Sequence, residues 1–352
     1  MTGRRKVAVA LSGGVDSAAA AAILKGRGFE VVGITALIPR VGGGLATALE
    51  EARSVALALR IPHEVVDLRD EFERLVIEPF LAEYLAGRTP NPCVVCNRRI
   101  KFGLLMEQAL RTGCDAFATG HYTRVEDRER GPALLRAGDE RKDQAYVLWQ
   151  LSRPVLSRLM FPLGDMTREE AAEVTRLAGV TRTAAESQDA CFMAGTDLAS
   201  LFDGHPSVTP GPILDARGNV LGGHRGLARY TIGQRHGLGL GGDRAYYVLE
   251  IRPEDNALVV GSRQDLPVGG FTVGEVSFVG ESPPAPLECR VRTRYRGPAL
   301  PCRFEPGEEG SGEVLYDGKG PEAVPGQSAV FYAGDEVLGG GLIVRKKPPP
   351  GT

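Results

Sequence analysis

The turn that follows the first apolar segment, "ALSGGVDSAAAAAIL" (10–24), constrains the fold of this chain most. An apolar strand ends at two glycines, Gly13 and Gly14, and continues into a helix-forming run of alanines. A backbone that turns in this way at a helix start points several amide N–H groups in one direction, and such a cluster binds an anion, most often phosphate. The Gly-Lys-Ser/Thr ending of a Walker A loop is absent. We therefore expect a phosphate-binding turn of another kind.

The segment from residue 6 to about 120 alternates short apolar runs with helical patterns. Runs at 6–11, 30–37, 63–68 and 115–120 predict buried strands, and helices are predicted at 17–26, 45–60, 70–86 and 98–111. This alternation indicates an α/β domain with a mostly parallel sheet, and its ligand should lie at the carboxyl edge. A further helix is expected from Thr167, because Glu170 follows at capping-box spacing.

The texture changes after about residue 203, where proline and glycine separate short strand-like runs. We predict an α/β domain over 1–207, a small central β-rich domain over 208–280 and a C-terminal β-barrel over 281–346. The proline-rich stretch 280–288 marks the second boundary, and the tail 347–352 is expected to be disordered.

The 352 residues carry a formal net charge of -2, which argues against wholesale electrostatic binding of nucleic acid. A local basic stripe is still predicted in "CRVRTRYRG", where arginines occupy every even position from 290 to 296: Arg290, Arg292, Arg294 and Arg296. On a strand these side chains share one face about 6.6 Å apart, close to phosphate spacing. A solvated barrel face is the alternative. With no segment of membrane-spanning length, we expect a soluble cytoplasmic protein.

Three of the six cysteines are candidates for chemistry. Cys93 and Cys96 form a C-x-x-C pair without the second pair that a zinc site would need, so a redox dithiol remains possible. Cys191 lies among small and polar residues in "ESQDACFMAG", which predicts an accessible thiol. The other three, in apolar contexts, are expected in the core: Cys114, Cys289 and Cys302.

Eight motifs occur in a fixed order: "SGGVDS", "TPNPC..CN..IKF", "ATGHY", "KDQAYVL", "ESQDACF", "YTIGQR.GLG", "RTRYR" and "PGQSAVFY". The first resembles the PP-loop of ATP pyrophosphatases, and the set resembles the tRNA-specific 2-thiouridylase family over residues 5–345. The resemblance implies ATP and Mg²⁺ as cofactors, with tRNA and a persulfide donor (a cysteine desulfurase or a sulfur-relay protein) as partners. It implies that AMP is attached to the wobble uridine C2 oxygen before a cysteine persulfide delivers sulfur.

The resemblance also implies roles for individual residues. It places the persulfide on Cys191 and its partner thiol on Cys96, with Arg98, Arg99 and Lys101 expected to lower the pKa of these thiols. The nucleotide set comprises Ala10, Leu11, Ser12, Gly13, Gly14, Val15, Asp16 (suited to Mg²⁺), Ser17, Ala36, Leu37 and Gly120. The tRNA set comprises Asn91, Pro92, His121, Lys142, Asp143, Gln144, Arg294, Tyr295 and Gln327.

Cys93 departs from the family pattern, because many members carry Asp at that position, a candidate acid–base for the uracil. Three thiols suit a four-iron cluster with one open iron, and they equally suit a persulfide site in which Cys93 is a spare resolving thiol. We favour the persulfide route. Two other functions are weighed: a PP-loop ligase or amidotransferase acting on a small metabolite, and a non-catalytic tRNA or sulfur carrier, which would have no use for ATP.

Overall fold

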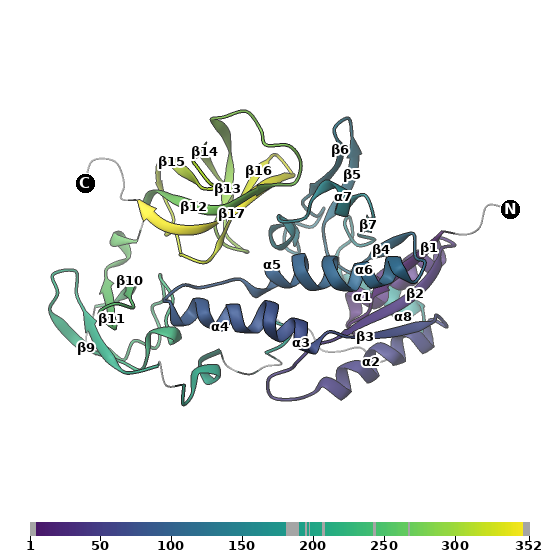
Figure 1. Ribbon diagram of the computed structural model, residues 1–352, viewed down its shortest axis with the longest axis horizontal. Coiled ribbons are helices and arrows are strands. Elements are labelled where there is room, and N and C mark those ends of the chain that lie inside the picture. The colour runs from purple at the N-terminus through teal and green to yellow at the C-terminus, as the bar shows by residue number, and fades with distance from the viewer. Residues whose placement is uncertain are drawn as a thin grey trace.

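The computed structural model describes residues 5–180, 190–193, 196, 198–205, 208–241, 244–266 and 268–347. It contains three bodies: an α/β domain on the right of Figure 1, a small β-sheet on the left, and a β-barrel above them. Two long helical segments lie between these bodies. The predicted α/β domain followed by two small β domains, the last a barrel, is confirmed.

The α/β domain is built on a five-stranded parallel sheet in the order β3-β2-β1-β4-β7. Its strands are β1 (Lys6–Ala10), β2 (Glu30–Leu37), β3 (His63–Asp67), β4 (Ala116–Ala118) and β7 (Leu159–Met160). The first four match the predicted runs, whereas β7 has only two residues and was not predicted.

Helices cover both faces of this sheet. On one face, α1 (Val15–Gly26) and α2 (Leu45–Ala58) pack through alanines and valines against Val7 and Val9. Alanines allow close helix–sheet approach, which explains the run after the glycines. Beside α1 lies α8 (Arg168–Leu177), where the predicted capping box is present: the Thr167 backbone N–H donates to Glu170 Oε2 at 2.7 Å.

Two continuous helical segments cover the other face. The first joins α3 (Arg69–Phe72), the π-helix η1 (Glu73–Ile77) and α4 (Glu78–Leu85). The second joins α5 (Pro92–Cys96), the π-helix η2 (Asn97–Leu105) and α6 (Met106–Arg111). Both bury aromatic side chains against the sheet, including Phe72 and Phe102. The second segment begins six residues before the predicted start at Arg98, because the Asn91 side chain caps it.

The central domain is a four-stranded sheet in the order β10-β11-β8-β9. It comprises β8 (Gly211–Leu214), β9 (Val220–His224), β10 (Tyr247–Arg252) and β11 (Ala257–Gly261). Ile213, Val248 and Leu258 form the apolar centre of this sheet.

The described residues also contain short helical turns outside the main helices. These are η3 (Ala145–Leu148), α7 (Arg153–Leu156), η4 (Leu198–Phe202), η5 (Leu227–Arg229) and η6 (Arg263–Asp265).

Six strands form the barrel, which closes where its first and last strands pair. They are β12 (Val268–Phe278), β13 (Leu287–Arg292), β14 (Leu300–Pro306), β15 (Gly312–Gly320), β16 (Ser328–Ala333) and β17 (Glu336–Lys347). The predicted boundary at 280 is therefore wrong, since β12 belongs to the barrel. The prolines that indicated a linker form the β12–β13 connection instead. Lys347, assigned to the disordered tail, is the last residue of β17, and residues 348–352 lie outside the described part.

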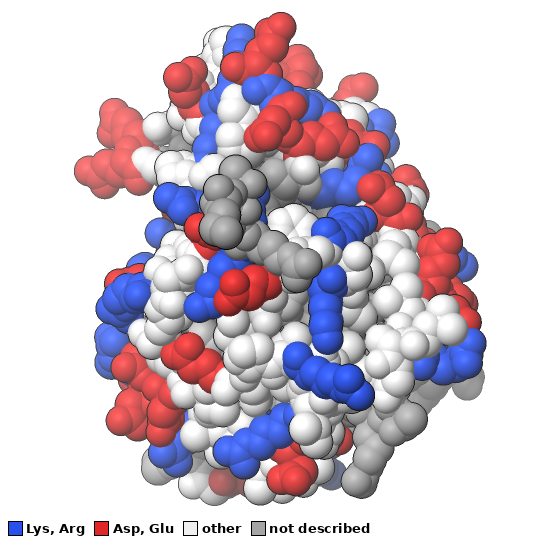
Figure 2. Space-filling model, turned by 90° about the vertical axis from the view of Figure 1, so that its right-hand side faces the viewer, with Lys and Arg blue, Asp and Glu red and all other residues white. Residues whose placement is uncertain are grey.

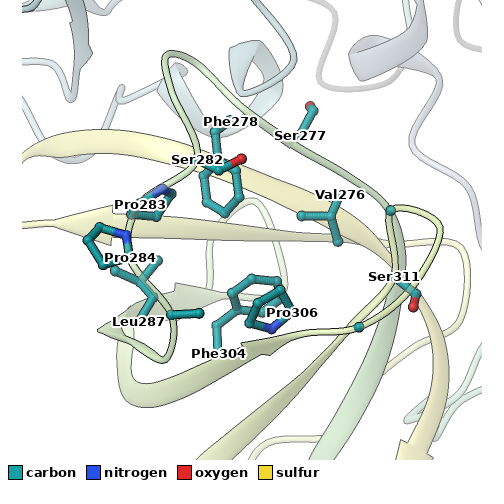
Figure 3. Close-up of a pocket in the computed structure, with 13 residues that line it drawn as sticks. Val276, Ser277, Phe278, Ser282, Pro283, Pro284, Leu287, Phe304, Pro306 and Ser311 are labelled. Carbon is teal, nitrogen blue, oxygen red and sulfur yellow. The ribbon is translucent and has the colours of Figure 1, made fainter.

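The proline-rich connection lines a pocket of about 210 Å³ at the edge of the barrel (Figure 3). Phe278, Leu287 and Phe304 point into it, and its lining contains no titratable side chain. This pocket therefore lacks an acid–base group, including one that could activate its serine hydroxyls as nucleophiles.

A hairpin that was not predicted joins the α/β domain to the barrel. Strands β5 (Arg124–Arg128) and β6 (Gly131–Leu135) extend the barrel sheet through pairing of Leu135 with Glu336. Within the described residues, no helix is both long and apolar enough to cross a membrane.

Candidate active site

The glycine turn between β1 and α1 forms a tight loop that only glycine can make at its centre. Gly13 has a φ of 81°, and a Cβ there would lie 2.6 Å from the Cβ of Glu51. The Ser17 hydroxyl donates to the Gly14 carbonyl at 3.0 Å and accepts from the Ser12 backbone N–H at 3.3 Å. Ser17 therefore holds the loop closed, and the first amide groups of α1 face the end of β1 as an anion site.

The end of β4 packs directly against this loop. A Cβ on Gly120 would lie 2.5 Å from the Asp16 carbonyl carbon and 2.8 Å from the Ser17 nitrogen. Two residues later, the Tyr122 hydroxyl donates to Asp16 Oδ1 at 2.8 Å. Close backbone approach and a fixed carboxylate are what a bound nucleotide and its metal ion require.

The predicted adenine-contact residues lie at the same edge of the sheet. Ala36 and Leu37 end β2, which pairs with β1 in parallel register, and both are half-buried. Thr35, which the sequence reasoning missed, donates its hydroxyl to the Leu11 carbonyl at 2.8 Å and lies 2.8 Å from His63 Nε2. A threonine inside the apolar run "EVVGITAL" was the available signal, because a buried hydroxyl needs a partner.

The three candidate cysteines converge although Cys96 and Cys191 are 95 positions apart. The Asn91 side chain accepts from the Cys93 backbone N–H at 3.1 Å and so begins the helix that carries Cys93 and Cys96. Cys191 lies in a turn anchored by Phe192, whose ring contacts Phe72 at 5.8 Å between centroids. Cys96 and Phe192 belong to one apolar cluster, which brings the segment with Cys191 to the cysteine helix. The negative charge of a Cys191 thiolate accordingly raises the pKa of both other thiols.

The expectation that basic neighbours lower the pKa of these thiols is wrong for Cys93 and Cys96. Burial raises the pKa of Cys96 to about 12. Part of Cys93 is exposed to solvent, but desolvation by the surrounding side chains raises its pKa to about 11. Lys101 opposes both shifts, whereas Arg98 and Arg99 are exposed and do not contribute. One lysine does not outweigh desolvation.

Lys101 is the cation at the centre of this group. It acts electrostatically on Cys93, Cys96 and His121. It lies in η2, and i→i+5 bonding in a π-helix brings residues five apart, such as Cys96 and Lys101, toward one side; such helices are frequent at functional sites. From the sequence alone, Lys101 is expected only as one of three basic neighbours of the thiols.

His121 is buried beside this group. Its Nδ1 lies 2.7 Å from the Thr119 hydroxyl, and its ring packs against Phe102. Burial first, and Lys101 second, hold the pKa of His121 well below its usual value, so the imidazole is neutral at pH 7. The prediction that His121 contacts tRNA therefore concerns a side chain that the folded chain largely encloses.

The remaining tRNA candidates from the two domains lie close together, but several side chains are engaged within the protein. Gln144 accepts from the Tyr122 backbone N–H at 3.0 Å. It also lowers the pKa of Tyr295, which burial and a Cys93 thiolate raise. Gln327 donates to the Thr89 carbonyl at 2.7 Å.

Burial and ion pairs engage other tRNA candidates. Pro92 and Lys142 are half-buried, and Arg294 pairs with Glu322 at 2.7 Å. The carboxylate of Asp143 is buried in an ion pair with Arg292, so the prediction that Asp143 contacts tRNA concerns a side chain enclosed by the protein.

The predicted stripe of four arginines does not exist in this structure. Strand β13 ends at Arg292, and residues 294–297 form a turn, so the alternation stops there. Arg290 donates to the Ala299 carbonyl at 2.7 Å, and Arg292 is buried under the α/β domain in an ion pair with Asp143. The face of the molecule in Figure 2 likewise carries interspersed acidic and basic side chains.

Among the described residues, no group of three or more Cys, His, Asp or Glu side chains is arranged to hold a metal ion.

The three cysteines expected in the core lie away from the candidate site. Cys114 and Cys302 are buried, and Cys289 is half-buried with its Sγ 3.6 Å from that of Cys302. The site is therefore a phosphate loop next to a cluster of three thiols and one lysine.

Three family models match successive parts of this chain. Residues 5–195 match a tRNA methyl transferase HUP domain, 201–262 a tRNA methyl transferase PRC-barrel domain, and 268–343 an aminomethyltransferase beta-barrel domain. All three descriptions mention methyl or aminomethyl transfer, which is not the chemistry that a phosphate loop beside three thiols indicates.

Several curated relatives are similar over nearly the full length, and all are named tRNA-specific 2-thiouridylase MnmA. The relative from Desulforudis audaxviator is 45% identical over 342 residues, which is 96% of this chain and 98% of that protein. The relative from Carboxydothermus hydrogenoformans is 42% identical and covers 98% and 99%. The relative from Chloroflexus aurantiacus is 44% identical and covers 96% and 98%.

Fold and site together define the class: an ATP-using enzyme whose phosphate loop lies at the carboxyl edge of a HUP-type sheet that also carries three clustered cysteines. Within that class, the chain belongs to the tRNA-specific 2-thiouridylase family. The resemblance inferred from the ordered motifs is confirmed.

Proposed function

We propose that this chain uses ATP to replace the C2 oxygen of the wobble uridine of tRNA by sulfur. The observation that carries the proposal is the convergence of Cys96 and Cys191, 95 positions apart. Lys101, which acts on Cys96, also acts on His121, the residue after the Gly120 that packs against the phosphate loop. A ligase acting on a small metabolite would need no such thiols, and a carrier would need no phosphate loop.

The first half of the reaction activates the uridine. A carbonyl oxygen is a poor leaving group, so it attacks the α-phosphate of ATP, and pyrophosphate leaves. The nucleotide set, Ala10 to Ser17 with Ala36, Leu37 and Gly120, binds ATP in this proposal. Glycine at 13 and 120 lets the loop pack closely against α2 and the end of β4. Asp16, oriented by Tyr122, is the carboxylate that would hold Mg²⁺. When bound, that ion neutralises phosphate charge.

The second half transfers the sulfur. The terminal sulfur of a Cys191 persulfide attacks uridine C2, and AMP leaves. The Cys96 thiolate then attacks the inner sulfur of Cys191, which leaves the sulfur on the base and a Cys96–Cys191 disulfide that a thiol reductant returns to two thiols. Cys93 is a spare resolving thiol in this scheme. Lys101 stabilises the thiolates, and the donor of the persulfide is a cysteine desulfurase or a sulfur-relay protein in the cytoplasm.

Substrate binding uses both domains. We propose that Asn91, Pro92, Lys142 and Gln144 approach tRNA from the α/β domain, while Arg294, Tyr295 and Gln327 approach it from the barrel. The effects of Gln144 and Cys93 on the pKa of Tyr295 support this arrangement, because they join the barrel turn to the α/β domain. Asp143 and His121 support it from within.

The test separates the two half-reactions. Pyrophosphate should be released from ATP only when tRNA is added; release with a small amide acceptor instead of tRNA would favour the ligase. Cys191→Ser should still release pyrophosphate but form no 2-thiouridine. Cys96→Ser should accept a persulfide on Cys191, detected by mass spectrometry, and then stop. A persulfide found on Cys96 and never on Cys191 would reverse the assignment.

An iron-dependent route is tested on the same protein. After purification without oxygen, the iron-free fraction should thiolate tRNA when a persulfide donor is present. Activity that appears only in proportion to bound iron and sulfide would contradict the persulfide route.

A further inference from the structure

Asp143 is a buried carboxylate that belongs to one domain and binds a guanidinium of another. Its side chain is 1% exposed, and its Oδ2 accepts from Arg292 Nη1 of β13 at 3.1 Å and from Arg136 Nε at 3.4 Å. Its Oδ1 accepts from the backbone N–H groups of Ala137 at 3.2 Å and Ala145 at 3.1 Å. Both oxygens are therefore fully used inside the protein.

The partner, Arg292, is equally enclosed. Its side chain is 9% exposed, and its guanidinium lies 5.4 Å from the centroid of the Tyr332 ring. A buried ion pair of this kind is a weak source of net stability, because desolvation offsets the attraction, but it strongly fixes the relative position of the groups that carry it. The pair therefore sets the barrel against the α/β domain.

Residues close in sequence to each member of this pair interact with the active site. Gln144, next to Asp143, accepts from the Tyr122 backbone N–H, and the Tyr122 hydroxyl donates to Asp16 of the phosphate loop. Three residues after Arg292, the Tyr295 ring packs against Tyr146 at 6.1 Å between centroids and interacts electrostatically with Gln144 and Cys93. The buried pair is thus connected, through the residues beside it, to both the nucleotide loop and the thiols.

We propose that Asp143 is a positioning residue: through Arg292 it fixes the turn with Arg294 and Tyr295 against Gln144, and so aligns the two halves of the tRNA site beside Cys93. It acts without touching tRNA. This inference rests on the proposed function, since it assumes that both segments contact tRNA.

The test is a double-mutant cycle with Asp143→Asn, Arg292→Met and the double variant. We expect KM for tRNA to rise at least tenfold in each single variant, with ATP affinity unchanged. The double variant should be no worse than the more defective single variant, because both remove one interaction. Glu140→Gln is the matched control: Glu140 pairs with the same Arg136 but is 75% exposed, so KM should not change.

Other outcomes overturn the inference. A lower melting temperature with normal KM at 25 °C would show a structural role only. Additive losses in the double variant would show that Asp143 acts independently of Arg292, as a direct tRNA contact would. If Asp143→Asn does not fold, Arg292→Lys provides the same comparison, because it keeps the charge but loses the planar geometry; normal KM there overturns the proposal. Failure of the wild-type chain to bind tRNA would instead reject the proposed function.

Discussion

At the scale of single residues, the protonation state of the Cys96 thiol limits how fast it can release sulfur to the base. Only the thiolate attacks a sulfur–sulfur bond, and burial raises the pKa of Cys96 to about 12. Below that pKa, each rise of one pH unit increases the thiolate fraction about tenfold. The free enzyme therefore holds this thiol protonated at neutral pH.

We predict that the resolving step accelerates with pH. In single-turnover reactions with a preloaded Cys191 persulfide, the logarithm of the rate should rise with a slope of about one between pH 7 and 9. Lys101→Met should lower the rate at each pH, since Lys101 stabilises the charged form, while Lys101→Arg should retain most of it. A flat profile in the wild-type enzyme would mean that substrate binding had already produced the thiolate.

Residue types alone predicted the phosphate loop and the cysteines, because their chemistry is local. They did not predict the environment of those residues. Lowered thiol pKa values were expected from basic neighbours in the sequence, but desolvation by distant segments prevails. The Asp143–Arg292 pair joins positions 149 apart, and no local pattern indicates it.

At the scale of secondary-structure elements, the contact between β4 and the loop before α1 shapes the nucleotide site. Gly120→Ala should abolish ATP binding, since its Cβ would lie 2.5 Å from backbone atoms of Asp16 that cannot move independently. Overpacking should also lower the free energy of unfolding by about 1–3 kcal/mol. Gly26→Ala in α1 is the matched control, because nothing lies within 4 Å of its Cβ position. Isothermal titration with ATP measures the difference, and equal binding by both variants would contradict it.

Alternation of strands and helices predicted the parallel sheet because each βαβ unit is specified locally. The β5–β6 hairpin and the place of β12 were missed for the opposite reason. Leu135 joins the barrel sheet by pairing with Glu336, and β12 by pairing with β15 and β17, strands that follow far later in the chain. Prolines at 283 and 284 indicated a boundary where the chain merely turns.

At the scale of the whole molecule, one short segment meets both small domains before it enters the cysteine helix. A Cβ on Gly87 would lie 2.9 Å from Pro253 of the central domain. The Thr89 hydroxyl donates to Thr231 at 3.2 Å, and its backbone N–H donates to the Pro325 carbonyl of the barrel at 2.8 Å. We therefore expect movement of either small domain to be transmitted to Asn91 and the helix that it caps.

Gly326→Ala tests this coupling. Gly326 has a φ of 89°, and an added Cβ would lie 3.0 Å from the Thr89 backbone. Gly334→Ala is the matched control, since its φ is also positive, at 59°, but nothing lies within 4 Å. In both variants, placing alanine in the left-handed region of φ costs about 1 kcal/mol. We expect Gly326→Ala to lose a further 1–3 kcal/mol, roughly, of unfolding free energy and to thiolate tRNA more slowly. Equal stability and equal rates in the two variants would show that the barrel and the cysteine helix are not coupled through Thr89.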